Sequence, residues 1–177
     1  MKSLFATFTT LLLSACSGSP TNYAPLETVP KVDLERYLGE WNEIARIDHW
    51  FQEGCANSKA HYSVRDDGDI KVLKSCILPD ESGKEDTATG RAWVTDEISN
   101  AKLKVQFPLR GIKLSFLAGD YWIIALDDDY SYAMIGDPKR EYLWILAREE
   151  TLPDEIMTML ISEAKIAGFP VETLVYR

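Results

Sequence analysis

Hydrophobic and polar residues alternate in short runs along most of this chain. In the run LKVQF at residues 103–107, every second residue is apolar, which places the apolar side chains on one face of an extended strand. Turn residues separate the runs, and connections this short join antiparallel neighbours. The pattern therefore predicts an all-β protein with eight antiparallel strands, at residues 41–47, 58–65, 70–78, 87–95, 101–107, 121–126, 130–136 and 142–148.

The hydrophobic period changes near the carboxyl terminus. Residues 153–168 open with Pro153, carry apolar residues at helical spacing and stop at Gly168, so they are expected to form an α-helix. Residues 171–176 are expected to form a short terminal strand. Because closure of a sheet removes its exposed edges, eight strands followed by one helix favour a closed up-and-down barrel over a sandwich. Residues 31–177 are expected to form this single domain.

The amino terminus has the layout of a bacterial export signal. Residues 1–15 combine Lys2 with an apolar run that is too short to span a membrane. The sequence LSAC that ends at Cys16 resembles the lipobox of bacterial lipoproteins, in which this cysteine is acylated and becomes the new amino terminus. The alternative is an ordinary signal peptide with a cysteine there by chance. Residues 16–30 are rich in Ser, Thr and Pro and are expected to form a tether.

The charge and the cysteines fit an exported protein. A formal net charge of −9 makes nucleic acid a poor partner and leaves membrane contact to the acyl anchor. Ser17 stands where an Asp signals inner-membrane retention in such lipoproteins, which points to the outer membrane. The periplasmic side is the expected face, although the sequence leaves the side of the membrane open. Export exposes thiols to oxidation, so Cys55 and Cys76 are expected to form a disulfide, and two free buried cysteines are the alternative.

Three short motifs occur in order along the strand pattern. The sequence GEW opens the first strand, DDY precedes the seventh, and an arginine ends the eighth; their main residues are Gly39, Trp41, Asp129, Tyr130 and Arg148. With this order and spacing, residues 31–177 resemble the lipocalin family, and in particular its bacterial outer-membrane lipoproteins. Asn42 and Asp128 depart from the family pattern, which usually has Tyr and Thr at these positions.

The resemblance implies a barrel with one closed end. In the family the motif Trp forms the floor of the barrel and the motif Arg stacks on it, so Trp41 and Arg148 are expected to have this structural role here. The spacing of Cys55 and Cys76 also recurs in the bacterial members, which supports the disulfide.

The resemblance and the strand alternation together predict which side chains face the interior. An eight-stranded barrel has room for side chains or for one small ligand, and a mostly apolar wall with a few polar groups suits a fatty acid or a lysophospholipid. Lys74 is the candidate partner for a carboxylate or phosphate head, unless the strand register differs by one and turns Lys74 to solvent. The predicted ligand-binding residues are Ala60, Tyr62, Val72, Lys74, Leu103, Val105, Phe107, Tyr121, Ile123, Ala133, Ile135, Tyr142 and Trp144.

Two other classes of function remain open at this point. The barrel could be filled by its own side chains, as in a structural or interaction lipoprotein of the envelope. An enzyme that modifies lipids would need Cys76 as a free thiolate, because His49 and His61 stand in no recognisable catalytic arrangement. No metal-ligand spacing and no cofactor motif is found, and the acidic run 127–129 is interpreted as a solvated turn. Whether the barrel forms a homodimer stays open.

Overall fold

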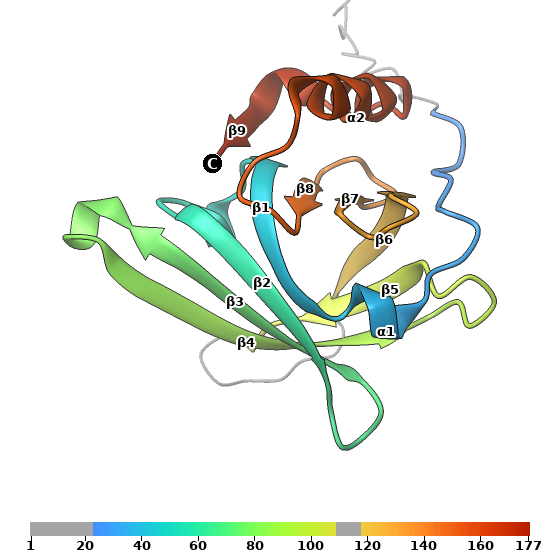
Figure 1. Cartoon of the computed structure of the whole chain (residues 1–177), viewed down its shortest axis with the longest axis horizontal. Helices are drawn as coiled ribbons and strands as arrows, with labels where there is room; N and C mark the ends of the chain where they lie inside the picture. Colours follow the sequence, from blue (N-terminus) through green and yellow to red (C-terminus); the bar gives the residue numbers. More distant parts are fainter. Residues whose placement is uncertain (1–22, 109–117) are drawn as a thin grey trace, which may run out of the picture.

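The computed structural model describes residues 23–108 and 118–177 (Figure 1). Eight strands close into an antiparallel barrel, because β1 pairs with β2 on one side and with β8 on the other. This confirms the fold that the sequence predicts. The strands are β1 Gly39–Ile47, β2 Ala56–Val64, β3 Ile70–Leu78, β4 Lys84–Val94, β5 Lys102–Gln106, β6 Gly119–Leu126, β7 Tyr132–Gly136 and β8 Leu143–Ala147, with a ninth, β9 Leu174–Tyr176, paired to β1.

The described residues contain one helix of 13 residues and several short helical turns. The helix α2, Asp154–Ile166, confirms the prediction from the carboxyl-terminal periodicity. The chain also contains a short helix α1, Leu34–Tyr37, and the 3-10 turns η1 Trp50–Gln52, η2 Pro79–Glu81 and η4 Val171–Thr173. Within the described ranges, no helix is both long and apolar enough to cross a membrane.

Two predicted strand starts are wrong for local reasons, and one short helix was not predicted. The strand expected from residue 130 begins at Tyr132, because Tyr130 adopts a φ of 60° in the turn that follows β6. The terminal strand expected from residue 171 begins at Leu174, since a 3-10 turn occupies residues 171–173. The short helix α1 was not predicted, although Asp33 marks its start. The Asp33 carboxylate accepts hydrogen bonds from the backbone amides of Glu35 and Arg36.

The barrel has two different ends. Successive antiparallel strands reverse direction, so the connections β1–β2, β3–β4 and β7–β8 lie at one end and the connections β2–β3, β4–β5 and β6–β7 at the other. The helix α1 lies at the second end, where it precedes β1. We call this second end the closed end and the first the open end.

Trp41 and Arg148 seal the closed end. The Arg148 guanidinium lies 3.8 Å from the centre of the Trp41 ring, and the Trp41 side chain is fully buried. The same guanidinium donates hydrogen bonds to the backbone carbonyls of Arg36, Leu38 and Glu40 at distances of 2.7–2.9 Å. It therefore joins the end of β8 to the segment that leads into β1, as the resemblance implies.

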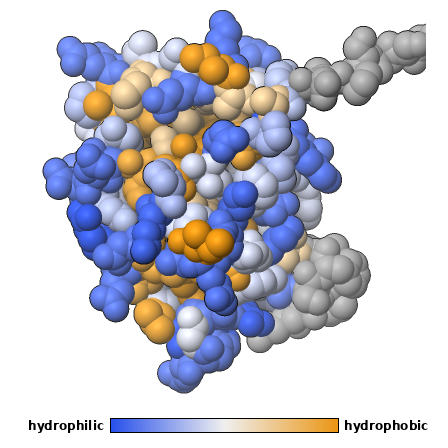
Figure 2. Space-filling view, turned by 90° about the vertical axis from the view of Figure 1, so that its right-hand side faces the viewer, coloured by the Kyte–Doolittle hydropathy of each residue, from blue (hydrophilic) through white to orange (hydrophobic). Residues whose placement is uncertain are grey.

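A second apolar core lies outside the barrel, under α2. Leu160 and Ala164 of the helix pack with Met134 and Ile145 on the outer face of β7 and β8. The face seen in Figure 2 carries small, separate hydrophobic patches among hydrophilic residues. The helix therefore covers an apolar strip of the wall and does not contribute to the barrel interior.

The segment before the barrel is not entirely a tether. Leu26 is buried in the outer core, and the Val29 amide donates a hydrogen bond to the Ile123 carbonyl of β6. The expectation of a free tether through residue 30 is therefore wrong for these residues, because an apolar side chain within a Pro- and Thr-rich segment is enough to dock it. Cys16 and the signal segment 1–15 lie outside the described residues.

Replacing Arg148 should destabilise the fold. Arg148→Ala removes the stacked cation and leaves several carbonyls without their donor, so the free energy of unfolding should fall by roughly 1 to 3 kcal/mol. Arg36→Ala is the matched control, because the Arg36 guanidinium stacks on Tyr130 at 4.1 Å but is exposed. Urea unfolding should show a loss below about 1 kcal/mol for Arg36→Ala. Equal losses in the two variants would contradict the role given to Arg148.

Candidate functional site in the barrel interior

The strand register brings most of the predicted ligand-binding residues together. All of them except Lys74 and Tyr142 belong to the apolar cluster that fills the barrel. Ile135, for example, pairs with Ile123 on one side and with Trp144 on the other, so one row of side chains runs around the wall. Several residues that the sequence list omits belong to the same cluster, among them Tyr37, Ile70 and Ala92.

Three tyrosines form the middle layer of the interior. The Tyr121 hydroxyl shares hydrogen bonds with the hydroxyls of Tyr37, at 2.7 Å, and Tyr62, at 2.9 Å. Burial raises the pKa of Tyr62 to about 12 and raises the pKa values of the other two as well. All three are therefore neutral at physiological pH, and sharing hydrogen bonds removes most of the cost of burying their hydroxyls.

Little free space remains around the tyrosines. The apolar cavity that they line together with residues of β3 to β6 measures about 10 Å³, which is room for about one water molecule. A pocket that holds a lipid-sized ligand needs several hundred cubic ångströms. A ligand could therefore occupy this part of the barrel only if side chains move aside.

A buried carboxylate organises the layer nearer the open end. The Glu43 side chain is only 4% exposed, and its carboxylate accepts hydrogen bonds from the Lys74 ammonium and the Arg46 guanidinium at 3.0 Å each. The Gln52 side-chain amide donates a further bond at 3.0 Å. Burial alone would raise the pKa of Glu43, but Lys74, Gln52 and Arg46 outweigh it and hold this pKa at about 2. Glu43 is therefore ionised at any physiological pH.

Lys74 points into the barrel, as strand parity predicts. Its neighbours across β2 and β4 are the small residues Ala60 and Ala88, which leave room for the long side chain. Its ammonium also donates to the Gln52 side-chain oxygen and lies 5.8 Å from the centre of the Trp144 ring. The prediction that Lys74 awaits a ligand head needs correction in one respect, because Glu43 already binds this ammonium.

A bulge in β1 allows Glu43 and Arg46 to face inward together. The pairing with β8 shifts between Glu43 and Ala45, so one extra residue separates the two inward side chains. In regular alternation, positions 43 and 46 would face opposite sides of the wall. Regular alternation therefore does not predict that Arg46 faces inward, whereas Glu43 shares the parity of the inward Trp41 and was not selected among the predicted site residues.

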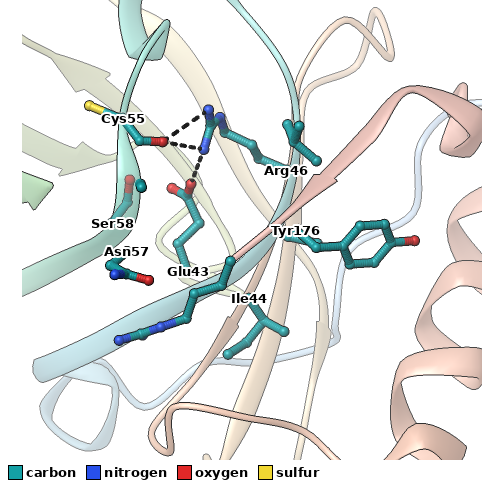
Figure 3. Close-up of a pocket in the computed structure, with 11 residues that line it drawn as sticks. Glu43, Ile44, Arg46, Cys55, Asn57, Ser58 and Tyr176 are labelled. Carbon is teal, nitrogen blue, oxygen red and sulfur yellow. Dashed lines mark hydrogen bonds and ion pairs between the residues drawn. The ribbon is translucent and has the colours of Figure 1, made fainter. Parts of the chain in front are cut away.

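The loop between β1 and β2 folds over the mouth and is fixed there. The Arg46 guanidinium donates to the carbonyls of Gln52, at 3.3 Å, and Cys55, at 3.5 Å, and Figure 3 shows it between Glu43 and Cys55. Cys55 forms a disulfide with Cys76 of β3, as predicted. This bond and the Gln52 contacts hold the loop against the barrel.

One hydrogen-bond donor in this layer is left unused. The two cations, Arg46 and Lys74, are balanced by two carboxylates, the buried Glu43 and Asp48, which pairs with Arg46 at 3.0 Å and is 52% exposed to water. Among the described residues, the Nε–H of Arg46 is buried without a hydrogen-bond partner. The layer therefore offers an unused donor on a cation that shares Glu43 with Lys74.

Aromatic side chains surround the layer at the open end. The His49 ring stacks on Phe51 with centroids 3.6 Å apart and meets the edges of Tyr142 and Trp144. Burial, together with the charges of Lys74 and Arg46, lowers the pKa of His49 to about 4. His49 is therefore a neutral, aromatic part of the rim at physiological pH, and Tyr142 lies at this rim, not deep in the barrel.

A small side cavity lies where β2 leaves β1. Strands β1 and β2 pair from Gly39 as far as Asn42, and beyond that point β1 pairs with β9. The gap measures about 20 Å³ and is lined by Glu43, Arg46 and Ser58, among others (Figure 3). It has room for a water molecule beside the ion pair but not for a lipid.

The remaining candidates give no sign of catalysis or of metal binding. Cys76 is bonded to Cys55, so it offers no thiolate. Asp129 lies exposed in the turn after β6, as expected, and His61 is exposed on β2. Residues 23–108 and 118–177 contain no cluster of three or more acidic, His or Cys side chains that could hold a metal ion.

Comparison with known proteins gives a consistent family. The lipocalin-like domain family matches residues 32–177. The chain is 41% identical over 165 residues to the outer membrane lipoprotein Blc of Citrobacter freundii, covering 93% of this chain and 89% of that protein. It is 35% identical to the protein of the same name from Vibrio cholerae, with 99% and 98% covered. Insecticyanin from the tobacco hornworm shares the fold, with a TM-score of 0.69 at 17% identity over 90% of this chain and 87% of that one.

The buried ion pair should show strong coupling in stability. Lys74→Met keeps the side-chain length but removes the ammonium, so the Glu43 carboxylate loses a main partner, and the free energy of unfolding should fall by about 3 kcal/mol. Adding Glu43→Gln removes the buried charge as well and should recover a large part of that loss. Urea unfolding of the two single variants and the double variant measures the coupling. If the double variant lost as much free energy of unfolding as the two single variants together, the pairing of Glu43 with Lys74 would be contradicted.

Proposed function

Because the chain belongs to the lipocalin family, we propose that it binds a fatty acid or a lysophospholipid in its barrel, as a lipid-anchored protein of the bacterial outer membrane. The observation that carries this proposal is the division of the interior into two layers. An apolar layer lies toward the closed end, and a layer with two cations and an unused Arg46 donor lies toward the open end. An amphiphile with an acyl chain and an anionic head has the same division.

The acyl chain would occupy the apolar layer. Its walls include the small residues Ala60, Ala92 and Ala133, which take up little of the barrel diameter. Each CH₂ group that leaves water contributes about 0.8 kcal/mol. The tyrosine rings fill this layer in the described structure, so the chain must push them aside, and the bonds among their hydroxyls are the main interactions that would change.

The anionic head would bind at the layer of Lys74 and Arg46. A carboxylate or phosphate there can accept a hydrogen bond from the Nε–H of Arg46. It can also accept one from the Lys74 ammonium, which binds Glu43 at the same time. Glu43 then sets a limit, because its own charge repels an anion placed directly against it. The head is therefore expected on the rim side of Lys74, next to the aromatic ring of Trp144.

Anchoring follows from Cys16. The relatives from Citrobacter and Vibrio are named outer membrane lipoproteins, and Cys16 ends a sequence that resembles a lipobox. Acylation of Cys16 would place the barrel at the outer membrane, and we propose that it faces the periplasm.

The small cavity favours a second candidate function. A barrel with about 10 Å³ of free space around its tyrosines suits a structural or interaction lipoprotein of the envelope that holds no ligand. Catalysis has less support, because the disulfide occupies the Cys76 thiol. A barrel that binds a ligand must let its interior side chains move aside, whereas a filled barrel keeps them in place.

Titration with a fluorescent fatty acid tests the proposed function. The wild-type barrel should give saturable quenching of its tryptophans at micromolar ligand. Ala60→Trp fills the interior and should abolish this signal while the fold loses at most about 3 kcal/mol to overpacking. Thr89→Trp adds the same ring at an exposed position of β4 and should bind as the wild type does. A wild-type barrel that gives no saturable signal would favour the filled barrel.

A further inference from the structure

We infer that the open end of the barrel docks on a lipid surface through Trp50 and Phe51, with the closed end pointing away from the membrane. This inference rests on the acylation of Cys16 proposed above, but not on the identity of any ligand inside the barrel. Three features of the described residues carry it: an exposed aromatic pair, the place where the chain leaves the barrel, and the charge around the mouth.

The exposed aromatic pair lies at the tip of the loop between β1 and β2. Trp50 is 70% exposed and Phe51 is 49% exposed, although both carry large apolar surfaces. The loop is held by the disulfide of Cys55 and by the buried contacts of Gln52, so the two rings are presented on a fixed support. Aromatic rings in such a position suit the interface between lipid and water, where Trp is enriched in membrane proteins.

The chain leaves the barrel at the same end. The Arg140 guanidinium, in the connection between β7 and β8, donates to the carbonyls of Ala24 and Ala167. Two residues farther on, the Tyr142 ring lies 5.7 Å from the ring of Phe51. The first described residues of the chain are therefore close to the mouth loop and not to the closed end.

The length of chain before this point restricts the orientation. At roughly 3.4 Å per residue, the chain from Cys16 to Tyr23 spans at most about 25 Å. The nine residues of β1 alone extend about 30 Å from the closed end to the mouth. An acyl anchor at Cys16 therefore keeps the open end near the lipid, whereas the closed end can reach the surface only if the barrel turns over.

Charge around the mouth indicates how the contact forms. The exposed residues of the β1–β2 loop and of the hairpin between β3 and β4 are mostly acidic, namely Asp48, Glu53, Asp80, Glu81, Glu85 and Asp86. Anionic lipids would repel such a rim, so attraction of opposite charges does not hold the mouth to the surface. Insertion of apolar rings explains the contact, and zwitterionic lipids are the expected partner.

A second copy of the chain fits the aromatic pair less well. A stable dimer buries about 800 Å² on each partner, whereas two aromatic side chains supply at most about 500 Å² even if buried completely. A lipid surface has no such threshold here, because the anchor already holds the barrel beside it. Docking in this orientation would also let an amphiphile pass between the lipid and the barrel mouth with a short path through water.

Fluorescence quenching in vesicles tests this orientation. The full-length acylated protein is reconstituted into phosphatidylcholine vesicles whose acyl chains carry bromine, a contact quencher of Trp. Part of the Trp emission should be quenched, and this part should disappear in Trp50→Ser. Ile98→Ser is the matched control, because Ile98 is an 87% exposed apolar residue in the connection between β4 and β5 at the closed end, and its loss should leave the quenching unchanged. Replacing a third of the lipid with phosphatidylglycerol should weaken the Trp50 signal.

Each outcome decides the orientation separately from ligand binding. Anchored protein without Trp50-dependent quenching would overturn the inference, and so would quenching lost in Ile98→Ser instead. If mass spectrometry shows that Cys16 carries no acyl group, the premise fails and the inference is overturned with it. Self-association that depends on Trp50, seen by sedimentation, would assign the surface to a second copy. Trp50-dependent quenching in a protein that binds no fluorescent fatty acid would support the docking and reject the proposed ligand.

Discussion

The structure of the barrel mouth depends on one buried carboxylate. An ionised Glu43 inside an otherwise apolar wall is tolerated only if charged and polar partners surround it, because the cost of removing it from water is several kcal/mol. Lys74 must therefore face inward, and Arg46 must share the same face, which the bulge in β1 makes possible. Gln52 reaches the carboxylate only if the loop after β1 folds over the mouth. This charge and the Cys55–Cys76 disulfide thus fix the course of that loop together.

The two ends of the barrel serve different purposes as a result. At the closed end, Trp41 and Arg148 join strands that are distant in the sequence, and their contacts leave no opening for a ligand. At the open end, polar groups occupy positions where a purely apolar interior would be more stable. Buried ion pairs seldom add net stability compared with apolar residues of the same size. We therefore propose that these groups near the mouth recognise the polar head of the ligand.

The sequence was sufficient for the fold but not for the site. Period-two alternation and the turn residues are local patterns, and they predicted the barrel correctly. The stacking of Arg148 on Trp41 was implied by the resemblance to the lipocalin family, and the structure agrees. Parity also turned Lys74 inward correctly. It failed for Arg46, because a bulge after Glu43 shifts parity without a local signal, and Glu43 was missed although it shares the parity of Trp41. Gln52 was missed because its contacts join positions that only the folded loop brings together. The acidic residue three positions before Arg46 was the only available hint of an ion pair.

Native mass spectrometry of protein purified without detergent tests the central claim most directly, namely that the interior opens to hold one amphiphile. The Cys16→Ser chain, secreted into the periplasm, is compared with the same chain carrying Ala60→Trp. We expect the Cys16→Ser protein to carry one bound molecule with an acyl chain and an anionic head, which is released on denaturation. The same protein with Ala60→Trp should carry little or none. The bare protein mass in both, under conditions that preserve weak complexes, would show that the barrel is filled by its own side chains.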